Sequence, residues 1–356
     1  MIERKKNKLL AVLTKNRRFP LFFAILLTVC TLVGTVSPQG VFAQEAEWVY
    51  VSGQSVGIAM MSRGLIVVKA GEVKDENGKA FFPAADAGIR PGDIVTHIDG
   101  EEILSAGHLT EIMCKKTDEA VKVTYTRGDK TVTVKVKLAL DADSGGRKLG
   151  LIVRDSTSGI GTLTFVDGDS GNYASLGHAI TEVTTGIVIP AREGTLSHCM
   201  IKGIVKGKSG QPGELRGSFS LQSPLGSVTK NNEFGVYGEF YNKKALDGMT
   251  KMQVCPRDEI KIGRASILCT LDDGGAEYYD VTINKINSQS SKGVKGLVIE
   301  VVDEDLLEKT GGIVQGMSGS PIVQDGRLVG AVTHVMINDS SKGYGIFAEW
   351  MLDEAA

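Results

Sequence analysis

The chain has 356 residues, of which 42% are hydrophobic, and its formal net charge is −2. This length is enough for two globular domains and an additional segment, and the charge gives no reason to expect a nucleic-acid partner. The 44 glycines and 9 prolines indicate many turns and short strands rather than a helical bundle.

The N-terminus joins a basic segment to an uncharged one. Seven lysines and arginines lie in residues 1–18, and residues 19–44 carry no charge around the apolar core Leu21–Val36. We interpret residues 1–44 as a cytoplasmic basic tail followed by a signal-anchor or transmembrane segment, with the rest of the chain exported. The apolar core is near the lower length limit for a membrane-spanning helix, and Val41-Phe42-Ala43 is also a candidate cleavage site. The sequence leaves anchor and cleaved signal both open.

Residues 52–140 are predicted to form the first domain. The segment Phe82–Glu101 is typical of a short helix, a Pro-Gly-Asp turn, an alternating strand and an Asp-Gly turn. It resembles a bacterial PDZ domain, which implies that residues 105–116 are the helix lining a peptide groove. The resemblance also implies a carboxylate-binding loop that precedes the peptide-binding edge strand. That loop is assigned to Ser55, Val56, Gly57 and Ile58.

The expected ligand of this domain is an extended peptide, and the chain's own sequence is one candidate. A spacer without a ligand is the alternative.

Residues 149–356 are predicted to form a second domain, after a polar linker at residues 141–147. The chain here becomes a succession of short apolar runs separated by Gly, Asn, Asp and Ser turns, without long helical periodicity. This pattern favours a pair of β-barrels over an α/β hydrolase, whose nucleophile needs a strand-to-helix turn. The predicted fold class is therefore mainly β: a membrane segment, a PDZ domain and a chymotrypsin-like double β-barrel.

The chemistry is predicted to centre on the turn Gly316–Pro321, which reads G-x-S-G-x-P. Glycine allows backbone conformations that other residues avoid, so the turn can expose the Ser318 hydroxyl as a nucleophile. The N–H groups of Gly316 and Ser318 would then form an oxyanion hole. Asp325-Gly326 between apolar runs predicts a hairpin directly after the turn.

A serine nucleophile needs a base and a group that orients it. His178 lies 140 residues before Ser318, and this order is that of chymotrypsin-like enzymes; His198 is the rival base. The acid is less well defined. Asp303 ends an apolar run 15 residues before the serine, whereas an ordinary chymotrypsin-like acid lies nearer the middle of the interval. Competing acids between His178 and Ser318 are Asp247, Asp258, Asp272 and Asp280, and Asp247 is nearer the ordinary chymotrypsin-like position.

The sequence resembles the stage IV sporulation protein B peptidase family from about Val51 to the C-terminus. The resemblance rests on Gly311–Trp350, Gly159–Phe165 and the Leu176-Gly177-His178 element. It implies a catalytic triad of His178, Asp303 and Ser318. It also implies a membrane-associated serine peptidase that acts between the mother-cell and forespore membranes, cleaves itself, and cleaves a membrane-bound regulator of the protease that activates a late sporulation sigma factor.

Residues after the nucleophile are candidates for the substrate pocket, because the strand that follows the serine hairpin lines the cleft in chymotrypsin-like folds. These candidates are His334, Gly343 and Gly345. No cysteine or histidine spacing is typical of a metal site, so we predict neither metal nor cofactor. A Ser–Lys peptidase is disfavoured because the nearest lysine after Ser318 is Lys342. The main alternative is a PDZ and β-barrel scaffold that binds membrane-protein partners without cutting them.

Overall fold

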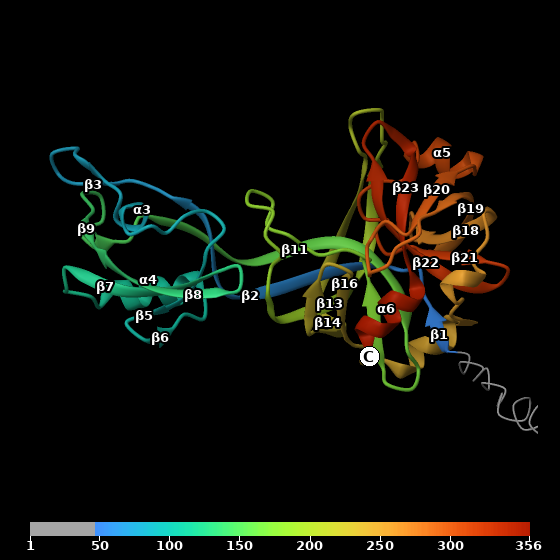
Figure 1. The fold of residues 1–356 in the computed structure, drawn as a ribbon, viewed down its shortest axis with the longest axis horizontal. Helices are drawn as coiled ribbons and strands as arrows, with labels where there is room; N and C mark the ends of the chain where they lie inside the picture. The colour runs from blue at the N-terminus through green and yellow to red at the C-terminus, as the bar shows by residue number, and fades with distance from the viewer. Residues whose placement is uncertain (1–46) are drawn as a thin grey trace, which may run out of the picture. The chain divides into compact units, whose positions relative to one another are not determined.

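The computed structural model describes residues 47–356 (Figure 1). The predicted basic tail and signal-anchor at residues 1–44 lie outside the described residues. Within residues 47–356, none of the helices has the length and apolar character needed to cross a membrane.

The first barrel is built from a curled antiparallel sheet. Its strand order runs β15-β16-β12-β11-β2, and β13 continues it by pairing with β2 and then with β14. A bridge between Gly226 and Phe240 returns the end of β14 to the end of β16, so the sheet closes on itself. Its interior holds buried apolar residues that include Val56, Leu163 and Tyr173. The strands are β1 (Trp48–Val51), β2 (Ser55–Ala70), β11 (Leu151–Val166), β12 (Asn172–Ser175), β13 (Ala191–Val205), β14 (Glu214–Val228), β15 (Lys230–Asn232), β16 (Gly235–Glu239) and β17 (Thr250–Gln253).

The second barrel is closed, with strand order β18-β19-β20-β23-β22-β21. Its core includes Ile267, Ile299 and Val332. The predicted Asp-Gly hairpin is confirmed, since β21 and β22 pair across Asp325 and Gly326, which both have positive φ. The elements are η1 (Lys243–Gly248), η2 (Arg257–Glu259), β18 (Gly263–Thr270), β19 (Ala276–Ile286), β20 (Leu297–Val301), α5 (Glu304–Thr310), β21 (Pro321–Gln324), β22 (Arg327–Met336), β23 (Asp339–Phe347) and α6 (Ala348–Ala355).

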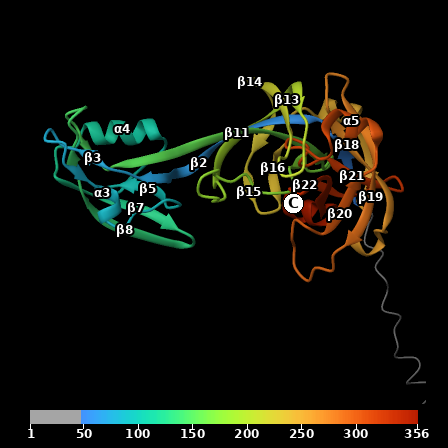
Figure 2. The same ribbon diagram turned by 90° about the horizontal axis from the view of Figure 1, so that it is seen from above.

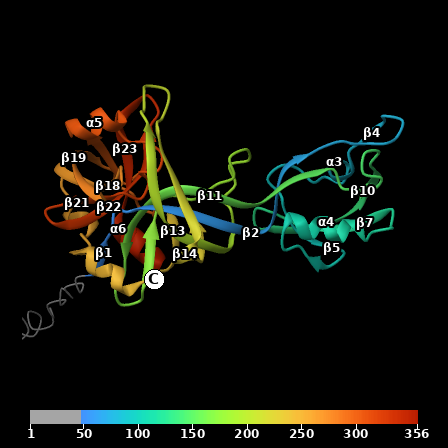
Figure 3. The same cartoon turned by 180° about the vertical axis from the view of Figure 1, so that it is seen from behind.

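The PDZ unit is inserted between the two longest strands of the first barrel. Beyond the barrel, β2 and β11 go on pairing with each other, and β2 also pairs with β5, as Figures 2 and 3 show from two further sides. The added elements are β3 (Val73–Lys74), β4 (Ala80–Phe81), α3 (Pro83–Asp86), β5 (Ile94–Ile98), β6 (Glu101–Glu102), α4 (Ala106–Cys114), β7 (Ala120–Arg127), β8 (Lys130–Lys137), β9 (Ala139–Leu140) and β10 (Arg147–Lys148).

The structure moves the expected domain boundaries. Residues 55–61 pair with β11 and β13 inside the first barrel, although they were assigned to the PDZ domain. Leu149, Leu151 and Val153 pack in the PDZ core, although they were assigned to the peptidase domain. The reason is that each long strand serves both cores, with the register between them shifting near Ile152 and again between Arg154 and Ser156.

Candidate active site

The nucleophile turn is anchored to the first barrel although it belongs to the second. Ser318 is half-buried, and its carbonyl accepts a hydrogen bond from the N–H of Thr162 in β11 at 2.9 Å. Gly316 and Gly319 have φ values of 99° and 95°, a region that L side chains rarely adopt. A Cβ on Gly319 would overlap the Thr162 carbonyl oxygen, so the glycine after the serine allows the two barrels to meet.

The sequence predicts the N–H groups of Gly316 and Ser318 as oxyanion donors, and the structure shows how their peptide groups are held. Among residues 47–356, neither the N–H of Gly316 nor that of Ser318 donates a hydrogen bond. The carbonyls of their peptide groups are held elsewhere: Gln315 O accepts from Leu215 N at 2.8 Å, and Met317 O accepts from Ser320 N at 2.9 Å. Because a peptide N–H points opposite to its carbonyl, both donors are left free for a developing oxyanion.

His178 lies close to the nucleophile. It follows Leu176 and Gly177, which both have positive φ, and its ring centroid is 4.8 Å from that of His334. The Ser318 hydroxyl donates to the carbonyl of Thr333, the residue before His334, at 2.8 Å. The structure therefore brings Ser318, His178 and His334 together in one place.

The state of His178 suits a general base. Its Nδ1 lies 2.9 Å from the Ala179 carbonyl, which can only accept, so this nitrogen carries the proton and Nε2 has the free lone pair. Burial lowers the pKa of His178 below its usual value, and the Ala179 carbonyl opposes part of that shift. The imidazole is therefore neutral near pH 7 and able to take a proton.

The expected partnership of Asp303 with His178 is absent from this structure. Asp303 is the N-cap of α5: one carboxylate oxygen accepts from Leu306 N at 3.0 Å, and the other accepts from Asp280 N at 3.1 Å. Both oxygens are thus engaged in closing the strand-to-helix turn. Within the described part of the chain, the Ala179 carbonyl is the sole hydrogen-bond partner of the His178 ring.

Comparison with known families agrees with this geometry. Residues 145–352 match the model of the SpoIVB peptidase S55 family, which is more than half of the chain, and residues 56–138 match a PDZ domain. The chain belongs to the SpoIVB peptidase S55 family. The Gly316–Ser320 turn and His178 both lie within the residues that this family model matches.

More distant similarities cover parts of the chain. A probable periplasmic serine protease do/HhoA-like of Haemophilus influenzae is 29% identical over 108 residues, which are 26% of this chain and 23% of that protein. The chain thus matches about a quarter of this relative. The PDZ domain of the SdrC-like protein of Listeria monocytogenes is 31% identical over 26% of this chain and 87% of that chain, with a TM-score of 0.21. The HtrA-type protease AlgW with tripeptide is 16% identical, covering 55% of this chain and 54% of that chain, with a TM-score of 0.31.

An amide side chain that the sequence analysis missed holds the His178 segment of this S55 peptidase. Asn231, in β15, accepts from Ile180 N at 2.9 Å and donates to the carbonyls of Ile180 and Ile189 at 2.8 and 2.9 Å. Ile180 is two residues after His178, so this clamp limits where the base can move. The sequence does carry a signal for Asn231. Its amide lies between two strand-like runs, in the part of the interval between His178 and Ser318 where a chymotrypsin-like acid is expected.

The three pocket candidates have different surroundings. The ring of His334 packs beside His178, and burial, followed by the charges of His178 and Lys295, lowers its pKa to about 4. Gly343 and Gly345 are buried in β23. Their missing side chains leave room for Ile313 and Ile322, at 2.6 and 2.7 Å from where a Cβ would stand. These two glycines therefore serve the packing of the second barrel.

The expected carboxylate-binding loop is a buried strand. Gly57 lies in β2, where it pairs with Ile160 on one side and Ser197 on the other, and a Cβ there would overlap the Phe219 ring. Ser55 donates to the Thr270 carbonyl at 3.2 Å, across the two barrels. The assignment of Ser55, Val56, Gly57 and Ile58 to peptide binding is therefore wrong for this fold, because a strand paired on both edges cannot accept another.

The structure provides a different edge for a peptide. Residues 151–154 of β11 pair with β2 along one edge, and helix α4 packs near the other. Asp155 accepts from Ala106 N, the first residue of α4, at 2.8 Å. Leu109 and Met113 of α4 pack against the same core as Leu151 and Val153. An open strand edge beside an apolar helix is the arrangement by which PDZ domains bind extended peptides.

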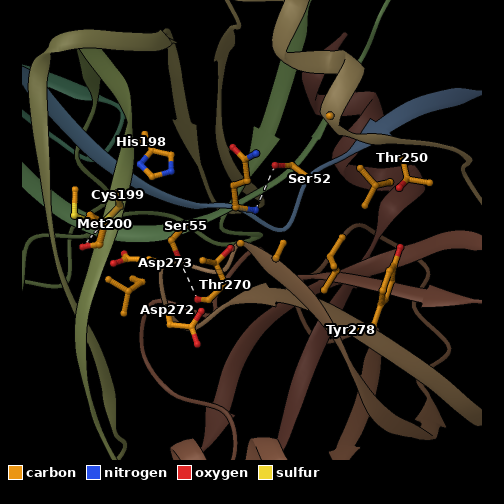
Figure 4. Close-up of a pocket in the computed structure, with 17 residues that line it drawn as sticks. Ser52, Ser55, His198, Cys199, Met200, Thr250, Thr270, Asp272, Asp273 and Tyr278 are labelled. Carbon is orange, nitrogen blue, oxygen red and sulfur yellow. Dashed lines mark hydrogen bonds between the residues drawn. The ribbon is translucent and has the colours of Figure 1, made fainter.

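His198 is separate from the nucleophile. It lines a cavity of about 630 Å³ together with Cys199, Asp272 and Tyr278 (Figure 4). The cavity is bordered by Ser55 and Thr270 and does not include Ser318. His198 is thus not placed to act as the base.

Proposed function

We propose that this S55 family member is an exported serine endopeptidase that cleaves peptide bonds through Ser318 and His178. The observation that carries the proposal is the pair of free N–H groups at Gly316 and Ser318, with their carbonyls anchored on the opposite side. Such donors stabilise the charge that develops on a carbonyl oxygen during acyl transfer.

The proposed reaction uses groups already close together. The Ser318 hydroxyl donates to the Thr333 carbonyl at 2.8 Å, so the proposed reaction begins with rotation of this side chain toward His178. His178 takes the proton as Ser318 attacks the scissile carbonyl, and later gives it to the leaving amine. The Ala179 carbonyl, in place of a carboxylate, holds the tautomer of His178 that can act as base. An acyl-enzyme is then hydrolysed by water with the same base.

The biological role is proposed from the family resemblance. It comprises self-cleavage, and cleavage of a membrane-bound regulator of the protease that activates a late sporulation sigma factor. The basic tail and the apolar segment at residues 1–44 support attachment to a membrane with the peptidase outside the cytoplasm. The PDZ unit would bind a peptide of the substrate or of the chain itself along residues 151–154.

The test uses the purified exported part and a biotinylated fluorophosphonate. The wild-type protein is expected to gain one covalent adduct on Ser318 and to cleave a peptide found by library screening. Ser318→Ala is expected to lose both while keeping the circular dichroism of the wild type. Cleavage by Ser318→Ala at the wild-type rate would refute the nucleophile assignment. A folded wild type that neither labels nor cleaves would favour the non-catalytic scaffold.

A further inference from the structure

Three peptide groups connect the residues that carry the oxyanion donors. Gly316 N belongs to the first, Ser318 N belongs to the third, and the Gly316–Met317 peptide lies between them. The outer two are anchored through main-chain donors, Leu215 N and Ser320 N. The carbonyl of the middle one is anchored by a side chain, since Thr162 Oγ1 donates to Gly316 O at 2.9 Å. Its N–H, on Met317, donates to Val314 O at 3.1 Å.

Without the contact from Thr162, the carbonyl of the middle peptide has no hydrogen-bond donor among residues 47–356. Gly316 has no Cβ and a φ of 99°, so rotation about its bonds meets little steric resistance. A rotation of the peptide that precedes Gly316 would turn its N–H, an oxyanion donor, away from the substrate. The hydrogen bond from the Thr162 hydroxyl holds the carbonyl oxygen of Gly316 and so opposes such a rotation.

Thr162 also connects the nucleophile to the base. Its N–H donates to Ser318 O at 2.9 Å, and its carbonyl accepts from Leu176 N at 3.4 Å, two residues before His178. The residue is 1% exposed and lies in β11, in the first barrel. A single buried residue thus contacts both sides of the Gly316–Ser318 turn and the His178 segment.

We propose that Thr162 is a positioning residue that holds the oxyanion hole in its active geometry through its hydroxyl. The inference rests on the proposed peptidase function and deepens it. Thr162 does not touch the reacting atoms, so the expected effect is on stabilisation of the transition state and not on binding of the substrate ground state.

The test compares three variants of the purified full chain, and the chain offers a matched control. Thr162→Val removes the hydroxyl at nearly constant volume, and Thr162→Ser restores a hydroxyl. Thr164→Val makes the same change two residues along β11, where Thr164 Oγ1 donates at 2.7 Å to Gly319 O, outside the oxyanion donors. Each variant is measured for kcat, for KM, and for inhibition by the boronic acid analogue of a cleaved peptide.

For Thr162→Val we expect kcat to fall by roughly 10- to 100-fold, somewhat less than for loss of a whole oxyanion donor, with KM within about twofold. The affinity for the boronic acid should fall by the same factor, because its tetrahedral adduct occupies the oxyanion hole. Thr162→Ser should recover kcat to within about threefold of wild type. Thr164→Val should lower kcat several-fold less than Thr162→Val does.

Equal losses of kcat in the two valine variants would reduce Thr162 to a structural role and overturn the inference. An unchanged boronic acid affinity in Thr162→Val would do the same. These outcomes are distinct from failure of the proposed function, which would appear as cleavage that survives Ser318→Ala. If Thr162→Val does not fold, Thr162→Ser still decides: because it retains the hydroxyl, a loss of kcat beyond tenfold with wild-type folding would contradict the proposal.

Discussion

The two halves of strand β11 have different neighbours and different tasks. Within residues 47–356, residues 151–154 pair with β2 on one edge only, beside α4 of the PDZ unit. Residues 163–166 pair with β12, and β1 pairs with residues 165 and 166, inside the first barrel. At the junction with the second barrel, Thr162 and Thr164 hold the nucleophile turn.

The difference shows that the availability of main-chain groups decides what a strand can do. An open edge has N–H and C=O groups free to bind an extended peptide. A covered edge has none, but its inward side chains are fixed well enough to position a catalytic turn. In this chain one continuous strand has both kinds of edge, so the proposed peptide-binding and catalytic sites are separated by position along β11.

The largest effect is expected from Gly319→Ala, which would disturb the contact between the Ser318 turn and Thr162 of β11. A Cβ at this position would overlap Thr162 O and stand 2.5 Å from Leu176 N, and φ is 95°. The backbone strain alone costs roughly 1–3 kcal/mol, and relief would move the Ser318 turn. We expect turnover of a short peptide to fall more than about a thousandfold. Gly326→Ala is the matched control, since φ there is 75° and its Cβ would meet nothing within 4 Å. Comparable turnover losses in both variants would contradict this reasoning.

The next effect tests the strand beside β11. Gly57→Val would drive a side chain into the Phe219 ring between paired strands. We expect a loss of roughly 1–3 kcal/mol in the free energy of unfolding. Turnover should fall equally for a protein substrate and for a short peptide. Gly159→Val, with open space around its Cβ, should have little effect on stability. A selective loss on the protein substrate would return Gly57 to a peptide-binding role.

The open half is tested by Leu109→Lys on α4. A charge in place of Leu109, which packs against the same core as Leu151 and Val153, should lower the affinity of a bound peptide at least tenfold, measured by fluorescence anisotropy. Turnover of a short generic peptide should stay within about twofold of wild type. The control is Ile152→Lys, because Ile152 is 55% exposed on the other face of β11. Loss of turnover in Leu109→Lys would mean that the PDZ unit supports the active site directly.

A smaller effect concerns pH. Burial lowers the pKa of His178, and only the neutral imidazole can accept the Ser318 proton. The acid limb of kcat/KM should therefore lie below pH 6.5, the ordinary histidine value, with activity falling as pH drops through that limb. The pKa of His334 is lowered as well, so His334→Gln should leave the position of the limb nearly unchanged. A limb at or above pH 6.5 would contradict the buried environment of His178.

Local patterns were the part of this fold that the sequence predicted well. The Gly316–Ser320 turn and the Asp325-Gly326 hairpin depend on residues within a few positions of one another, so their glycines and serine were enough to identify them. The likeness of the segment Phe82–Glu101 to a PDZ domain was readable for the same reason, and the match to a PDZ domain confirmed it.

Long-range pairing was what the sequence could not provide. Ser55–Ile58 look like a PDZ loop when read alone, and only pairing with Ile160 and Ser197 places them in the barrel. Leu149 and Leu151 look like the start of the next domain until β11 is seen to extend into the PDZ core. Contacts across more than a hundred residues depend on which strands meet, and no local pattern encodes that choice.

Asp303 gives the smallest expected effect and the sharpest disagreement between family resemblance and geometry. The resemblance predicts that Asp303→Asn loses on the order of ten-thousand-fold in turnover, as in triads that depend on an acid. The structure instead makes Asp303 the N-cap of α5, with both carboxylate oxygens accepting from main-chain N–H groups. Asparagine also caps helices well, so we expect Asp303→Asn to fold and to turn over a short peptide within about threefold of wild type.

Asp303→Ala separates capping from catalysis. Loss of the cap should cost about 1 kcal/mol in the free energy of unfolding, measured by urea denaturation, while turnover of the folded fraction stays close to wild type. Asn231→Ala provides the contrast, because it removes three hydrogen bonds that hold the His178 segment, and turnover should fall more than in either Asp303 variant. Collapse of turnover in a fully folded Asp303→Asn variant would mean that α5 and the His178 segment meet during catalysis. The catalytic groups would then include Asp303 of α5. The comparison between the peptide-facing and turn-holding halves of β11 would no longer describe the whole active site.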